Sequence, residues 1–167
     1  MSAERAVRRG VLLYSWLCIL LMLGCPQPNQ PNGRDPAPEF LLLQEGTRID
    51  AGTSCDMGTI CTNTAASLIF TIKNLGTEDL NLTGVPEPVA LSGPDASFFA
   101  VTVQPATPIP SGDTSEFTLR FTPTGSGGKS VNLTIEHDDV NATPFAFSAA
   151  GTGFEPAIRV PATGQTA

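Results

Sequence analysis

The fold is decided by one stretch of the chain, EFTLRFTPTGSGGKSVNLTIEHDD, residues 116–139. Its first part places Phe117, Leu119 and Phe121 on one face and charged residues or threonine on the other. Residues 131–136 repeat this alternation, and a segment rich in Gly, Ser and Pro, residues 123–128, lies between the two. Apolar residues at every second position indicate a β-strand with one buried face. The stretch therefore predicts two consecutive strands joined by a turn.

The same alternation recurs along the chain after residue 38, where no segment shows helical spacing of apolar residues over three turns. The further predicted strands are residues 40–43, 67–73, 80–83, 99–103 and 145–149. Residues typical of turns separate them, at 74–79, 92–95, 110–113 and 138–141. Short strands with one polar face each bury their apolar faces when two sheets pack together, and about 115 residues suffice for one core. We therefore expect an all-β, immunoglobulin-like antiparallel β-sandwich of about seven strands over residues 39–153.

Several motifs in this region resemble the choice-of-anchor D module, a bacterial relative of the ASH/Hydin-type and major-sperm-protein/PapD-like Ig folds. They include an Asn-x-Gly turn after a strand, a Gly-Asp turn before a Phe-x-Leu-x-Phe-x-Pro strand, and a terminal Gly-Thr-Gly. The segments concerned are FTIKNLGTEDLNLTGV (70–85), LSGPDASFFAVT (91–102), IPSGDTSEFTLRFTPTGSGGKSVNLTIEHDD (109–139) and PFAFSAAGTG (144–153). Residues 56–60, DMGTI, are similar to the family's Asp-Phe-Gly-Thr-Val, with Met57 in place of Phe. The resemblance implies a structural or binding module without a shared catalytic signature.

The N-terminal segment has the organisation of an export signal. Arg5, Arg8 and Arg9 precede residues 11–24, which are 14 residues without a charge. A helix that spans the hydrocarbon core of a bilayer takes about 20 apolar residues, so this run is short for a transmembrane helix. We therefore expect residues 1–24 to be a signal peptide.

The apolar run ends on a cysteine. Residues 21–25, LMLGC, resemble the bacterial lipobox, in which a small residue precedes a cysteine that is acylated and becomes the mature N-terminus. The resemblance implies lipidation of Cys25; the alternative is an ordinary signal peptide cut nearby. Residues 25–38 contain five prolines and no aliphatic residue larger than alanine, a composition typical of an extended tether. We expect a lipid-anchored protein of the cell envelope.

The charge excludes one class of partner. Without residues 1–24 the chain has 6 basic and 15 acidic residues. This balance argues against binding of nucleic acid through a basic patch, so we expect no nucleic-acid partner. We expect the protein to contact the membrane through its N-terminal lipid.

Two cysteines remain after the signal and the proposed lipidation site. Cys55 and Cys61 lie six positions apart, and an even pair in an oxidising compartment favours a disulfide. The alternatives are a metal pair or a redox site. The sequence has one histidine, and the Cys-x-x-Cys spacing of redox sites is absent. We expect a structural disulfide between Cys55 and Cys61, no metal site and no cofactor.

Catalytic candidates are few. His137 is the only histidine, and we expect it to be a solvated residue at a hairpin turn. The oxygen atoms of four residues near His137 are possible calcium ligands, but these residues lack the spacing of a calcium-binding loop. They are Asp138, Asp139, Asn141 and Thr143.

The sequence therefore predicts a non-catalytic module that recognises an envelope protein or a glycan. The alternative is a secreted hydrolase with an unrecognised active site. Residues 154–167 form a C-terminal tail that is either vestigial or pairs along a sheet edge.

Overall fold

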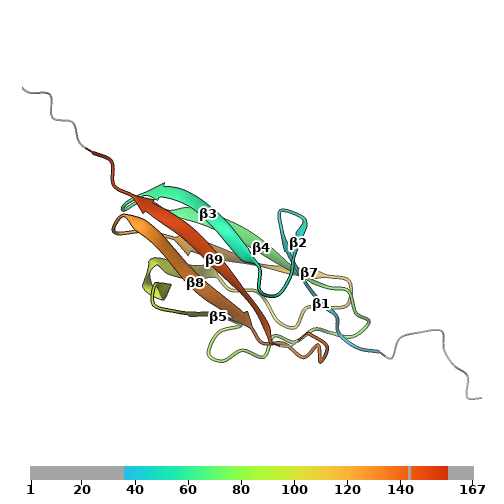
Figure 1. Cartoon of the computed structure of the whole chain (residues 1–167). Coiled ribbons are helices and arrows are strands. Elements are labelled where there is room, and N and C mark those ends of the chain that lie inside the picture. Colours follow the sequence, from blue (N-terminus) through green and yellow to red (C-terminus); the bar gives the residue numbers. More distant parts are fainter. Residues whose placement is uncertain (1–35, 143, 158–167) are drawn as a thin grey trace, which may run out of the picture. The chain divides into compact units, whose positions relative to one another are not determined.

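The computed structural model describes residues 36–142 and 144–157, which form two packed β-sheets (Figure 1). The described residues include one turn of 3-10 helix, η1 (Ala96–Phe98), and no helix of the length and hydropathy needed to cross a membrane. The expected all-β, immunoglobulin-like sandwich is confirmed. The described residues form nine strands rather than about seven. The predicted signal peptide, most of the tether and the end of the tail, residues 158–167, lie outside the described residues.

The first sheet has five strands in the order β2-β1-β4-β7-β6, all antiparallel. The alternating segments of the sequence account for four of them, and β2 is a short addition at the edge. The bounds are β1 (Phe40–Gln44), β2 (Thr47–Ile49), β4 (Ala66–Asn74), β6 (Phe99–Val103) and β7 (Thr114–Phe121).

The second sheet has four strands in the order β3-β9-β8-β5. Its strands are β3 (Ser54–Cys61), β5 (Val89–Ser92), β8 (Gly127–Ile135) and β9 (Phe145–Phe154). Strand β3 runs parallel to β9, so the sandwich is not purely antiparallel. Its register shifts between Asp56 and Thr59, where Gly58 has a φ of +78° and donates its N–H to Asp56 Oδ1 over 2.8 Å. This positive φ explains the glycine in the DMGT segment.

One predicted strand is absent. Residues 80–83 form only two isolated bridges, from Leu80 to Ile109 and from Leu82 to His137. Both leucines are nevertheless buried. The alternation here correctly indicates burial, but the segment crosses from one sheet to the other and completes no ladder in either.

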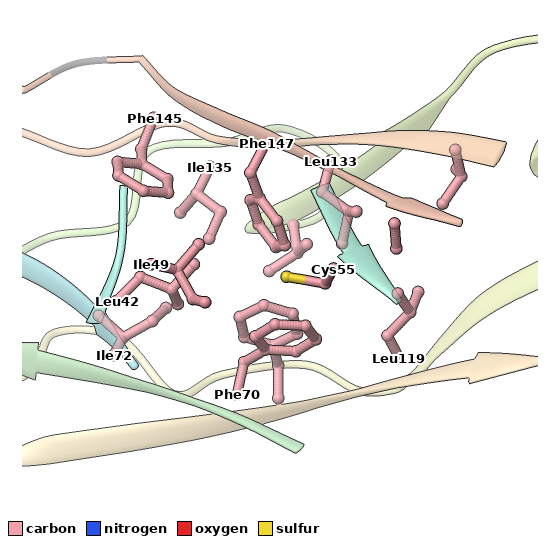
Figure 2. Close-up of a cluster of buried hydrophobic side chains, with 14 of the residues drawn as sticks. Leu42, Ile49, Cys55, Phe70, Ile72, Leu119, Leu133, Ile135, Phe145 and Phe147 are labelled. Carbon is pink, nitrogen blue, oxygen red and sulfur yellow. The ribbon is translucent and has the colours of Figure 1, made fainter. Parts of the chain in front are cut away.

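The core lies between the sheets and is built from the inward faces of the alternating strands (Figure 2). Phe70 is at its centre, with its ring centroid 5.0 Å from that of Phe117 and 5.3 Å from that of Phe147. Met57 and Cys55 of β3 are also buried in the core. Methionine thus fills the position at which the resembling family has phenylalanine.

The chain enters and leaves the sandwich at opposite ends (Figure 1). At the entry end Phe40 begins β1 and pairs with Asn74, the last residue of β4. At the exit end Phe154 ends β9, and its carbonyl accepts the N–H of Thr62. We call the first of these the entry end, since the N-terminal segment leads into it.

Candidate functional site

Asn74 is the centre of a hydrogen-bond network at the entry end. Its side chain is fully buried. The Oδ1 atom accepts the N–H groups of Glu39 (3.3 Å) and Gly76 (2.9 Å). The Nδ2 atom donates to the carbonyls of Glu78 (2.7 Å) and Ile109 (3.0 Å). One amide therefore joins the chain before β1 to the loops that follow β4 and β6.

The Asn-x-Gly and Gly-Asp motifs meet in this network. The N–H of Asn74 donates to the carbonyl of Asp113, and the N–H of Gly112 donates to the carbonyl of Asn74. Gly76 packs so closely on the chain at Ala37 that a Cβ atom there would collide with backbone. The two motifs are thus structural, because they bring three segments together at one buried asparagine.

His137 is buried, so the expectation of a solvated turn histidine is wrong. It is 3% exposed, and its ring lies flat on that of Phe40, with centroids 4.2 Å apart and an interplanar angle of 4°. Neither ring nitrogen has a hydrogen-bond partner among the described residues. The imidazole is used here as a flat aromatic group that covers the start of β1.

The acidic residues beside it hold backbone groups. Asp139 is buried, and its Oδ2 accepts the N–H of Phe40 over 2.9 Å while Oδ1 accepts that of Asn141 over 3.0 Å. Asp138 accepts the backbone and side-chain N–H groups of Asn81, at 2.9 and 2.7 Å. Thr143 lies outside the described residues, and within them no group of three His, Cys, Asp or Glu could hold a metal ion. These carboxylates act as acceptors that tie the loop after β8 to β1 and to residues 80–83.

Burial lowers the pKa of His137, although the nearby Asp139, Asp138 and Glu136 oppose this shift. The unfolded chain, with an ordinary histidine pKa, therefore binds a proton at a higher pH than the folded chain does. We expect the free energy of unfolding to fall as the pH drops from about 7 toward 5, by at most about 1.4 kcal/mol per pH unit from this group. His137→Phe keeps a flat ring and removes the titration, so it should flatten the profile. Urea denaturation between pH 5 and 7.5 measures both slopes, and equal slopes would contradict this role.

The predicted disulfide is not formed. Cys55 and Cys61 are both free thiols, the first buried and the second exposed. Both lie on β3, and six residues of strand extend about 20 Å. A disulfide needs Cα atoms within about 7 Å. Burial raises the pKa of the Cys55 thiol, which keeps it protonated and unreactive in the core.

The outer face of the four-stranded sheet carries short side chains in aligned rows. One row is Ser54, Ser148, Asn132 and Ser92, taken across β3, β9, β8 and β5. Two open hollows of about 300 and 200 Å³ lie over this sheet, the larger one at Asp56 and the start of β8. The polar outward residues predicted for β8 are confirmed. This face offers hydroxyl and amide groups.

The outer face of the five-stranded sheet carries aliphatic and charged side chains. Leu41 and Leu43 of β1 are half-buried, and Ile69 of β4 and Val103 of β6 are exposed. Charged side chains flank these aliphatic groups on the same face. They are Arg48, Lys73, Glu116 and Arg120.

The sequence alone matches a described protein family. The sequence profile of the HYDIN/CFA65/VesB-like Ig-like domain matches residues 48–151, which is more than half of the chain. The chain belongs to this family. Its strands β3 to β8 and most of β9 fall within the match. No curated protein matches the chain.

Solved structures with the same fold are similar to this domain at low sequence identity. The ASH/PapD-like domain 7 of human CEP192 is 16% identical with a TM-score of 0.51, covering 77% of this chain and 94% of that one. A protein of unknown function from Porphyromonas gingivalis W83 is 17% identical with a TM-score of 0.53; the match covers 74% of this chain and 51% of that one. At this identity the likeness establishes the PapD-like sandwich alone.

Proposed function

We propose that the protein is a lipid-anchored lipoprotein of the cell envelope. Its one Ig-like sandwich serves as a non-catalytic module that binds an envelope protein or a glycan. The observation that carries the proposal is the apolar run that ends on Gly24-Cys25. A Pro- and Asn-rich segment follows it and leads to β1. Several fatty chains on Cys25 would make the anchor effectively permanent, since each buried CH₂ adds about 0.8 kcal/mol of membrane affinity.

The entry end supports this arrangement. A tethered domain must hold its first strand firmly, and the start of β1 and the residue before it are held there by three contacts. Asn74 accepts the N–H of Glu39, Asp139 accepts the N–H of Phe40, and the His137 ring covers the Phe40 ring. The exit end and both outer faces are then left for a partner.

The non-catalytic part of the proposal rests on how the buried polar residues are used. The side chains of Asn74 and Asp139 form hydrogen bonds with backbone groups, and the ring of His137 is buried. Polar groups engaged in this way stabilise strands and loops and have no face toward a substrate. Members of the choice-of-anchor D family are held at the cell surface by different kinds of anchor. Membership of that family would agree with a non-catalytic module behind a lipid anchor.

The test is the Cys25→Ala variant of the full chain, expressed in a bacterium that acylates lipoproteins. We expect the unchanged protein to stay in the membrane pellet after a salt and carbonate wash. The variant should lose at least 90% of that association, because the acyl chains supply the anchor. Cys61→Ser is the matched control and should stay in the membrane. A Cys25→Ala variant that resists the wash as well as the unchanged protein would contradict lipid anchoring.

A further inference from the structure

We propose that the outer face of the five-stranded sheet binds a second copy of this chain about a two-fold axis. This contact does not depend on the lipid anchor. It is inferred from the register of β4, β7 and β6, which places aliphatic and charged side chains of the face in a self-complementary pattern.

The centre of the pattern is one row across three strands. Ile69 of β4 pairs with Thr118 of β7, and Thr118 pairs with Val103 of β6. Their neighbours Phe70 and Leu119 point into the core (Figure 2), so the row faces outward. Ile69 and Val103 are 55% and 54% exposed. They are the only large apolar residues within the described strands, apart from Phe154 at the exit end, that are exposed to this degree.

Two opposite charges flank this row on β7. Glu116 lies two residues before Thr118 and Arg120 two residues after it, on the same face. Four residues of strand separate them by about 13 Å, too far for an ion pair within one chain. Both are exposed, and neither makes a side-chain hydrogen bond or ion pair with another described residue.

Both charges find a partner when two copies of the chain are related by a two-fold axis that runs along the row Ile69–Thr118–Val103. The axis places β7 of one copy antiparallel on β7 of the second. Glu116 then faces Arg120 of the second copy, and Arg120 faces its Glu116, so two equivalent ion pairs form. Ile69 meets Ile69 of the second copy, and Val103 meets Val103. Paired surfaces of this kind are the rule in isologous dimers, and packed sheets keep their strands nearly aligned.

The charge of the molecule favours this face for self-association. The described residues contain 14 acidic and 4 basic side chains, so two copies repel each other over most of their surface. Three of the four basic residues, Arg48, Lys73 and Arg120, lie on the outer face of the five-stranded sheet. The electrostatic repulsion between two acidic copies is therefore smallest when they approach each other through this face. Its aliphatic side chains match apolar protein groups better than sugars, which protein surfaces usually bind with aromatic rings.

Charge reversal tests the proposal, with dimerisation of the full chain measured by sedimentation equilibrium in density-matched detergent. Glu116→Arg and Arg120→Glu each place like charges opposite one another, so each alone should raise the dimer dissociation constant about tenfold or more. An equimolar mixture of the two variants should restore the dimer, as should the double variant. Lys73→Glu has the same charge change as Arg120→Glu but faces no charge across the axis, and should leave the dimer intact.

Thiol trapping gives a second readout that association through the N-terminal segment cannot mimic. In a Cys61→Ser background, Thr118→Cys should form a disulfide-linked dimer in membranes under mild oxidation. Thr134→Cys, on the outer face of the other sheet, should not. Adding Arg120→Glu should abolish the Thr118→Cys product. Equal crosslinking at the two positions, a crosslink to a protein of another mass, or dimerisation insensitive to the charge reversals would each overturn the proposal.

Discussion

Replacing Asn74 with leucine should lower the free energy of unfolding by about 4 kcal/mol. Leucine has the same branched arrangement of side-chain heavy atoms, but it removes two N–H donors and an oxygen that accepts two hydrogen bonds from a buried site. The N–H groups of Glu39 and Gly76 and the carbonyls of Glu78 and Ile109 then lose their partners. Each buried polar group left unpaired costs about 1–3 kcal/mol, and those nearest the surface recover part of this from water. Urea denaturation followed by circular dichroism measures the loss.

Asn81→Leu is the control for this variant. Asn81 is exposed, and its side chain donates one hydrogen bond, to Asp138. Its loss should cost about 1 kcal/mol or less, because water replaces the partner. If Asn74→Leu were no more destabilising than Asn81→Leu, the network at the entry end would not be what holds β1 and the neighbouring loops together.

Phe70→Ala should destabilise the domain by about 3–5 kcal/mol, the range typical of a large ring removed from a close-packed core. Phe70 is completely buried and stands between the sheets against Phe117 and Phe147. The cavity would therefore lie where the two sheets meet. The preceding residue on β4 gives the matched comparison, since Ile69 points outward. Ile69→Thr, measured at a concentration where the protein is monomeric, should change stability by about 0.5 kcal/mol or less.

Thermal and urea unfolding of both variants provide the measurement. A small effect of Phe70→Ala, within 1 kcal/mol of the unchanged protein, would mean that the sheets close over the missing ring. The close packing of the core would then not be specified by the phenylalanines.

Local alternation was sufficient to predict the strands that make most of the core. Strands β1, β4, β7, β8 and β9 all have the period-two pattern, because one face of each is buried and the other is solvated. The outward position of the threonines and charges on β7 and β8 follows from the same pattern. These features need no knowledge of which strand lies beside which.

Strand β3 could not be predicted this way. Its bulge at Gly58 breaks the alternation, and its partner β9 is about ninety residues away and parallel to it. The even number of remaining cysteines instead favoured a disulfide between Cys55 and Cys61, but both lie along one extended strand and are free thiols. Strands β2 and β5 have only 3 and 4 residues, too few for a period to show.

His137 shows the same limit at a single residue. Its neighbours Glu136, Asp138 and Asp139 are those of a solvated turn. It is buried because Phe40, almost one hundred residues earlier, stacks on it and because Leu82 pairs with its backbone. Asn74 was recognised as part of a turn motif, but its six hydrogen bonds depend on segments that only the fold brings together.

We propose that Cys25 replaces the apolar segment as the membrane anchor, and the intact mass of the protein extracted from membranes decides this claim. We expect a mass equal to residues 25–167 plus a diacylglyceryl group, with or without a further fatty chain on the amino group. Mild alkaline hydrolysis should then remove the ester-linked chains. A chain that begins at another residue without acyl groups, or that retains residues 1–24, would contradict the claim.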